Sequence, residues 1–324
     1  MMATTETAMI CPACGSAAKR FGRHRNGLQR YRCLSCRKTF TQEHEPLQTF
    51  RVADYLNERR GLMAIQLLVE GCSVRTVERI TGIRLESLLD LLVIAGQRCE
   101  KLMNSIRNVK ASDVQCDEIW SFVGKKEGHK GPEQAYEDTI GDSYCWVAIE
   151  ARTKLVLAYE AGRRTLTHAM NLMRKLRTAT AEGRRFQLTT DGLNAYPTAV
   201  DEILADRVDF AQYVKVYVSP RESEARYSPP EFEKGYKVPI SGNPSKYRIS
   251  TSHVERQNLT MRMQIRRFTR LTNAFSKKLE NHKAAIALHF AYYNFCRIHG
   301  TLRVTPAMEA GVADHIWTIK ELLG

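Results

Sequence analysis

The chain has 324 residues, of which 43% are hydrophobic and 26% charged, ordinary values for a soluble protein of two or three folding units. Lysine and arginine together number 49 against 35 acidic residues, which gives a formal net charge of +14. No apolar run approaches the length needed to cross a bilayer, and no basic start precedes an apolar stretch at the N-terminus. We therefore expect no membrane association and no secretory signal, and a cytoplasmic location.

The positive charge is concentrated at the two ends of the chain. Residues 256–303 hold ten Lys or Arg and one acid, and residues 1–50 hold eight against three. A large cationic excess favours a polyanionic partner, and two separated basic regions are typical of an extended nucleic-acid footprint. The alternative is a surface that is simply basic throughout.

Four of the nine cysteines form two C-x-x-C pairs, Cys11/Cys14 and Cys33/Cys36, separated by 18 residues. Two such pairs can present four thiolates tetrahedrally to zinc, which leaves no open position and indicates a structural Zn²⁺. The alternative is four free thiols. We predict a zinc ribbon at residues 9–42 whose basic residues contact phosphates: Arg23, Arg25, Arg30 and Arg32. The five other cysteines are scattered among apolar residues, where we interpret them as small buried side chains.

Residues 47–105 have the apolar spacing of short helices separated by glycines. We expect helices over 51–70, from a Ser73 cap to residue 80, and over 84–95, with Gly71 and Gly82 as breaks. This rhythm favours a helix-turn-helix domain in which Arg84, at the start of the third helix, contacts DNA. A generic small helical bundle has the same rhythm and remains the alternative.

From residue 111 to 303 the periodicity alternates between strand and helix. We predict strands over 114–123, 143–151, 154–162, 184–192 and 213–218, and helices over 167–180, 196–204, 254–271 and 278–297. Residues 219–252 are rich in proline and are interpreted as an irregular insertion, and residues 304–324 as a C-terminal tail. This order predicts an α/β fold with a mixed sheet covered by helices.

Three acidic residues of this region stand where ligands are usually bound. Asp117 lies among apolar residues of the first strand, Asp191 lies at the C-terminal tip of a strand, and Glu255 opens a long helix. Carboxylate oxygens suit Mg²⁺, and a pair of such ions activates the attacking and leaving oxygens of a phosphodiester. Glu118 is the competing acid, although strand alternation places it on the opposite sheet face. The alternative for each acid is a solvated surface group.

Three stretches resemble the insertion-sequence-one family of bacterial DDE transposases. They are DEIWSFVGKK at 117–126, TTDGLNAY at 189–196 and HVERQNLTMRMQIRRFTRLTNAFSKKLENHK at 253–283. The N-terminal cysteine module and helices are similar to the DNA-binding portion of that family. The 63 residues between Asp191 and Glu255 exceed the interval of familiar members, and the proline-rich segment accounts for the excess.

The resemblance implies a ribonuclease H-like domain in which Asp117, Asp191 and Glu255 hold two catalytic Mg²⁺ ions. It implies cleavage at transposon ends, strand transfer into target DNA, and a homo-multimer associated with the bacterial nucleoid. The arginines expected to hold double-stranded DNA beside these acids are Arg256, Arg262, Arg266 and Arg267. His253 and His282 are candidates for contact with DNA or water, or ordinary surface and core residues. The rivals are a DNA-binding regulator with an inactive scaffold and a nuclease without transfer activity.

Overall fold

The computed structural model describes residues 9–23, 29–41, 59–218, 231–269 and 272–324. The chain divides into two compact units, residues 1–54 and 55–324, and each is described by itself. None of the helices in the described residues is long and apolar enough to cross a membrane.

The N-terminal unit is a small antiparallel sheet. Its strands are β1 (Met9–Ile10), β2 (Ala17–Arg23), β3 (Gln29–Cys33) and β4 (Thr39–Thr41), in that order across the sheet. The rings of Tyr31 and Phe40 stack with centroids 5.9 Å apart, and they form the apolar core together with the buried Cys11 and Cys33. Because these four buried side chains are too few to stabilise a fold, this unit needs an additional cross-link such as a metal.

The second unit begins with three helices: α2 (Arg59–Val69), α3 (Val74–Thr81) and α4 (Leu85–Met103). The Ser73 hydroxyl accepts a hydrogen bond from the Thr76 amide at the start of α3, and Gly82 ends that helix in the left-handed conformation. Residues 51–58 of the first predicted helix lie outside the described residues. Helix α4 is longer than predicted because its second half packs against α8 (Leu279–Phe295), where the side chain of Ala284 abuts Gly96.

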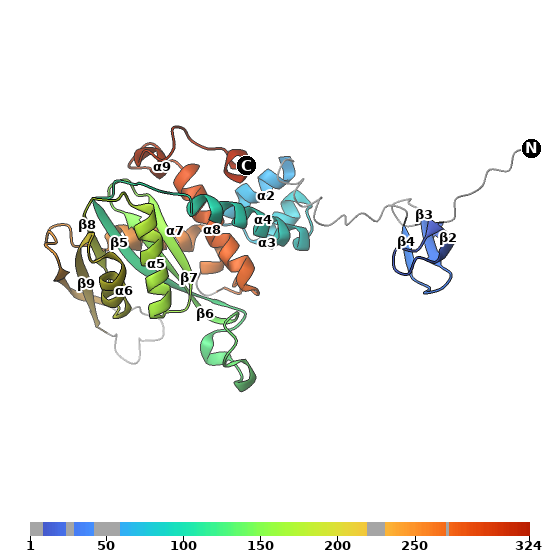
Figure 1. Ribbon diagram of the computed structural model, residues 1–324, viewed down its shortest axis with the longest axis horizontal. Coiled ribbons are helices and arrows are strands. Elements are labelled where there is room, and N and C mark those ends of the chain that lie inside the picture. The colour runs from blue at the N-terminus through green and yellow to red at the C-terminus, as the bar shows by residue number, and fades with distance from the viewer. Residues whose placement is uncertain (1–8, 24–28, 42–58, 219–230, 270–271) are drawn as a thin grey trace, which may run out of the picture. The chain divides into compact units, whose positions relative to one another are not determined.

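A six-stranded mixed sheet forms the centre of the second unit (Figure 1). Its order is β10-β9-β8-β5-β6-β7, with β8 parallel to both β5 and β9 and the other pairs antiparallel. The bounds are β5 Asp113–Val123, β6 Gly141–Glu150, β7 Val156–Gly162, β8 Phe186–Thr190, β9 Val208–Val218 and β10 Glu231–Ser241. The mixed α/β fold predicted from the sequence is thereby confirmed.

Strand β10 corrects the prediction of an irregular segment at 219–252. It pairs antiparallel with β9 at the edge of the sheet. Pro239 lies within β10, and an edge strand tolerates proline because one side of its backbone has no partner strand. Pro239 is therefore compatible with the edge strand that the prediction missed.

Helices cover both faces of the sheet. On one face lie α5 (Leu166–Ala179) and α6 (Ala195–Leu204), where the ring of Tyr196 meets that of Trp146 on β6. On the other face lie α7 (Ser252–Gln264) and α8, which contact alternate residues of β5. Nearly every residue of α8 is buried, as expected of a helix enclosed between the sheet and α4. The chain ends with α9 (Pro306–Glu309) and α10 (Ile319–Leu323).

His282 belongs to this core. It is fully buried on α8, with Nε2 3.0 Å from the Ser121 hydroxyl and Nδ1 3.3 Å from the Ser276 hydroxyl. Burial lowers the pKa of His282 to about 3, so the ring is neutral. Its contacts link β5 to α8 and the segment before it.

Candidate active site

The sheet register brings Asp117 and Asp191 together. The parallel pairing of β5 with β8 ends at Cys116 and Thr190, and the two aspartates are the next residue of each strand. Where one strand of a parallel pair stops, side chains from its neighbour become accessible at the carboxyl edge of the sheet. Glu255 reaches the same region from the first turn of α7, which packs against β5.

Carboxylate oxygens of Asp117, Glu118 and Asp191 all lie within 4.8 Å of one another. Glu118 is on the opposite face of β5 from Asp117, as alternation predicts, and accepts a hydrogen bond from the Tyr196 hydroxyl at 3.3 Å. Its carboxylate nevertheless approaches the two aspartates because β8 has already ended beside it. The sequence marks Glu118 only as an acid that competes with Asp117, and the structure places its carboxylate inside the cluster.

Glu255 lines the same cavity without joining that close cluster. The cavity, about 610 Å³ in volume, is bordered by Asp117, Asp191, Glu255, Arg164 and Lys215 among others. The Glu255 carboxylate accepts hydrogen bonds from the Lys215 ammonium and the Thr251 hydroxyl. The three predicted acids therefore share one cavity, while Glu255 is engaged by a lysine from β9.

Burial and mutual repulsion dominate the electrostatics of the acids. The pKa of Asp117 rises to about 8, first because of burial and then because of the charges of Asp191 and Glu118. Burial likewise raises the pKa of Asp191, against the stabilising Leu193 amide. Carboxylates in this arrangement disfavour full ionisation unless cations neutralise them, and oxygen donors suit a hard divalent ion.

Polar partners hold the acids in place. The Asn258 amide donates to Oδ2 of Asp117 at 2.9 Å, and Arg164 donates through Nε to Glu118 at 2.7 Å. The Glu118 side chain is only 3% exposed whereas that of Arg164 is 45% exposed, so the pair joins the interior to the cavity rim. Neither Asn258 nor Arg164 was singled out from the sequence. Asn258, three residues after Glu255 and so on the same side of α7, is the one that helical spacing could have found.

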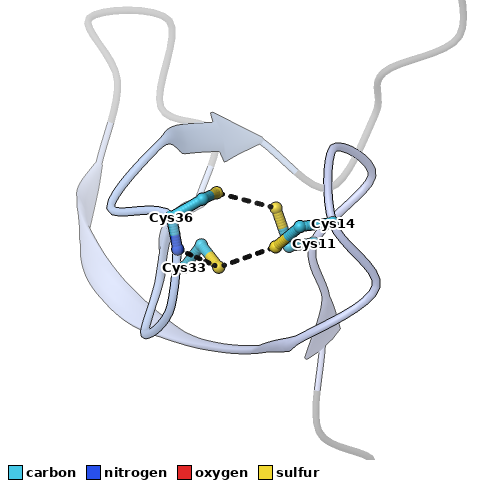
Figure 2. A group of neighbouring side chains, drawn as sticks. All are labelled: Cys11, Cys14, Cys33 and Cys36. Atoms are coloured by element: carbon cyan, nitrogen blue, oxygen red, sulfur yellow. Dashed lines mark hydrogen bonds between the residues drawn. The ribbon is translucent and has the colours of Figure 1, made fainter.

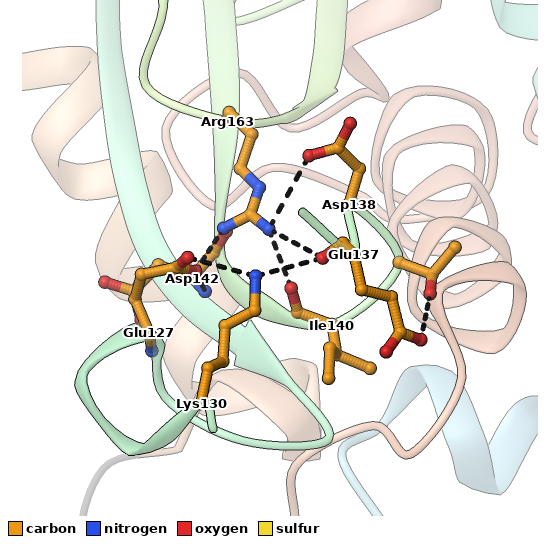
Figure 3. Close-up of polar contacts among 8 residues, drawn as sticks. Glu127, Lys130, Glu137, Asp138, Ile140, Asp142 and Arg163 are labelled. Carbon is orange, nitrogen blue, oxygen red and sulfur yellow. Dashed lines mark hydrogen bonds and ion pairs between the residues drawn. The ribbon is translucent and has the colours of Figure 1, made fainter. Parts of the chain in front are cut away.

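A network around Arg163 fixes the segment that carries Arg164 (Figure 3). The Arg163 guanidinium donates to the carboxylate of Glu127 and to the carbonyl oxygens of Ile140 and Asp142. Hydrogen bonds from Arg163 and then Lys130 lower the pKa of Glu127 to about 2. The connection between β5 and β6 is thereby tied to the end of β7, next to the cavity.

The four predicted cysteines converge in the N-terminal unit (Figure 2). The sulfur atoms of Cys11 and Cys36 lie 3.7 Å apart, those of Cys14 and Cys33 lie 3.4 Å apart, and all four fall within 4.8 Å of one another. Hydrogen bonds from Ser16 lower the pKa of Cys14 to about 6, which favours the thiolate. Four soft donors at this separation suit a tetrahedral Zn²⁺.

The predicted DNA-contacting arginines differ in their exposure to solvent. Arg23, Arg84, Arg256 and Arg266 are exposed, Arg30, Arg32, Arg262 and Arg267 are half-buried, and Arg25 lies outside the described residues.

Helix α7 ends at Gln264, not at residue 271 as predicted, because Ile265 is extended (φ −101°, ψ 101°). Arg266 and Arg267 therefore belong to a separate turn, Arg266–Phe268, and not to the helix that carries Glu255. His253 contacts the Lys154 ammonium at 3.2 Å.

Residues 140–226 match a family model described as a DDE domain, of the IS240 transposase type. The match includes Asp191 and leaves Asp117 and Glu255 outside its bounds. No curated protein matches the chain. The chain carries a DDE domain and is a DNA transposase, an enzyme that cuts and joins DNA strands using divalent metal ions.

Among solved structures, similarity is low. A chain of the simian T-cell lymphotropic virus intasome in complex with PP2A regulatory subunit B56 gamma has 12% identity and a TM-score of 0.34, covering 76% of this chain and 73% of that one. The Mos1 strand transfer complex has 15% identity and a TM-score of 0.20, with coverages of 47% and 57%. The piggyBac synaptic complex with hairpin DNA has 11% identity and a TM-score of 0.29, with coverages of 77% and 55%. This chain thus spans little more than half of the Mos1 and piggyBac chains.

Proposed function

We propose that this transposase uses Asp117, Asp191 and Glu255 to hold two Mg²⁺ ions for phosphodiester cleavage and strand transfer at the ends of its own element. The observation that carries this proposal is the meeting of the three acids at one cavity, at the point where β8 ends beside β5. The antiparallel β5–β6–β7 strands joined to the parallel β8 and β9 support a ribonuclease H-like domain. The sequence motifs support placement in the insertion-sequence-one family.

The bound ions would supply Lewis acidity and an activated oxygen nucleophile. The chain's own residues orient the acids. Asn258 fixes the Asp117 carboxylate, and Lys215 holds Glu255 at the cavity wall. Their side chains also bring positive charge or donors close to where a phosphodiester would be positioned, which favours binding of the DNA backbone.

We assign the N-terminal sheet as a zinc ribbon and α2–α4 as a helix-turn-helix domain, both of which bind double-stranded DNA at the terminal inverted repeats. The four converging sulfurs support the first assignment, and the Ser73-capped α3 with its glycine turn into α4 supports the second. Bridging two ends requires a homo-multimer, which acts on the bacterial chromosome in the cytoplasm.

The test is incubation of the purified chain with Mg²⁺ and labelled DNA that carries the ends of its own element. Nicked strands together with joined products are the expected outcome. Nicked strands without joined products would indicate a nuclease, and end binding without any cutting would indicate a DNA-binding regulator.

A further inference from the structure

A second cavity, separate from the carboxylate cavity, lies between the three N-terminal helices of the second unit and the α7–α8 region. Its volume is about 460 Å³, and we call it the helical cleft. Residues of α2, α4 and α8 line it, with Arg266, Arg267 and the segment 272–277. Residues 273–277 and Asn281 belong to the sequence stretch NAFSKKLENH, at 273–282, which the proposed metal chemistry leaves without a role.

The charged residues that line the helical cleft, in the part of the chain that the structure describes, are all cationic. Arg75, Arg266, Arg267 and Lys277 line it, and no Asp or Glu is among its described lining residues. The side chain of Arg267 has no hydrogen-bond or ion-pair partner in the described part of the chain. Burial lowers the pKa of Arg267 to about 10, which still leaves it charged at neutral pH. A half-buried guanidinium beside three other cations, with no counter-charge among the described lining residues, favours an anion in the cleft.

His289 adds an unused donor to the same cleft. It is 2% exposed on α8, and its Nε2 lies 3.3 Å from the amide nitrogen of Gln257. Burial lowers the pKa of His289 to about 3, so the ring is neutral and carries one hydrogen. Because the Gln257 amide nitrogen donates, Nε2 accepts and the hydrogen is on Nδ1, which has no partner. A buried N–H without an acceptor calls for a ligand oxygen or nitrogen.

The remaining wall is apolar. Leu85, Leu89 and Leu92 of α4 and Leu288 of α8 line the helical cleft. Such a wall excludes a bare inorganic ion as the best occupant and suits a flat, weakly polar group joined to an anion. A nucleotide has both parts.

We propose that the helical cleft binds one nucleotide unit of the DNA substrate, with its phosphate on Arg267 and its base or sugar against the leucines. The proposal rests on the proposed function, because it assumes that DNA is the substrate. It places a nucleic-acid contact between the helix-turn-helix helices and the catalytic domain, away from Asp117 and Asp191.

Cys72 provides a direct readout because it is a free, half-buried thiol in the cleft lining. The zinc-loaded full chain is alkylated with iodoacetamide with and without DNA carrying its element's ends, and the Cys72 peptide is quantified by mass spectrometry. Bound DNA should slow Cys72 alkylation at least about five-fold in the native chain and in Arg267→Lys. Arg267→Ala should lose most of this protection and bind DNA about ten-fold more weakly.

Arg174→Ala is the matched control, since Arg174 is exposed on α5 and its side chain donates a hydrogen bond to Asn171 on the same helix. It should keep full protection. If Arg267→Ala melts at a lower temperature, Arg266→Ala replaces it and should lose protection relative to Arg267→Lys. Unchanged Cys72 alkylation in the native chain while fluorescence anisotropy shows DNA bound would overturn the proposal. Equal protection by deoxyadenosine monophosphate alone would also overturn it, in favour of a free-nucleotide site.

DNA cleavage is measured on the same samples to separate this inference from the proposed function. Protection of Cys72 by DNA without any cleavage supports the helical cleft and refutes the catalytic proposal. Cleavage without protection of Cys72 supports the catalytic proposal and refutes the nucleotide site in the helical cleft.

Discussion

The four-cysteine cluster and the carboxylate cavity are both sites suited to a metal, yet the chain builds them differently. The cysteines come from two short motifs on hairpin turns, and their sulfur atoms face one another (Figure 2). The acids come from two strands and a helix, and Arg164, Lys215 and Asn258 bind them. A closed soft-donor site cross-links a fold, whereas an open oxygen-donor cavity with movable cations can exchange ligands.

The largest effect should come from Asp117→Asn. This change removes a negative oxygen between Asp191 and Glu118 while keeping the shape and the contact with Asn258. We expect Mg²⁺-dependent cleavage to fall by about a thousand-fold or more, with DNA-end affinity within about two-fold of the native value. Gel assays of cleavage and anisotropy measurements of binding test the two parts. Cleavage that persists at the native rate would remove Asp117 from the catalytic site.

Loss of zinc from the four-cysteine cluster should weaken DNA binding, whereas Asp117→Asn should weaken cleavage. Cys33→Ser leaves three thiolates, and because the N-terminal core is small, we expect loss of one zinc per chain and unfolding of residues 9–41. End binding should weaken by about ten- to a hundred-fold. Zinc content by atomic emission and protease resistance of this region are the measurements. A chain that keeps its N-terminal fold without zinc would show that the sulfurs are not a structural metal site.

The stability of the metal-free chain should depend on pH through Asp117. Its pKa is about 8 in the folded chain and about 4 when unfolded, so the unfolded state releases its proton first. The contribution of the protonated acid is complete below pH 4 and is lost as the pH rises towards 8. Asp117→Asn should therefore be more stable than the native chain at pH 8, by several kcal/mol, and close to it in stability at pH 4.

Thermal melts at the two pH values, with and without Mg²⁺, measure this difference. Mg²⁺ should stabilise the native chain at pH 8 and have little effect on Asp117→Asn. A native chain that is the more stable of the two at pH 8 without metal would contradict the electrostatic account of the cavity.

The smallest effect should come from Glu118→Gln. The amide still accepts from Arg164 and Tyr196 but lacks charge, so Arg164 is held less firmly and the repulsion on Asp117 is weaker. We expect cleavage to fall by about ten-fold or less, with retained fold and retained Mg²⁺ dependence. A loss as deep as that of Asp117→Asn would make Glu118, rather than Glu255, the third essential acid.

The sequence predicted a region well where the residues that determine its structure are close together in the chain. The C-x-x-C spacing alone brings four sulfurs together, and the apolar periodicity located most strands and helices of the sheet. It missed β10, because proline is compatible with an edge strand, and it extended α7 beyond Gln264, because basic residues continue a helical pattern that the backbone at Ile265 breaks.

The carboxylate cavity depends on strand register, which the sequence does not state. Only the end of the β5–β8 ladder at Cys116 and Thr190 explains why Glu118, on the opposite face, approaches Asp117. Arg164 could not be predicted from the sequence either, because a single arginine in a loop belongs to no recognisable motif. Its role follows from its hydrogen bond to Glu118.

The most direct test of the central claim is crystallography with Mn²⁺ in place of Mg²⁺, using anomalous scattering to locate the ions. We predict anomalous density between the carboxylates of Asp117 and Asp191, with Glu255 released from Lys215, and no such density in Asp117→Asn. Absence of Mn²⁺ from this cavity at concentrations that support DNA cleavage would contradict the account.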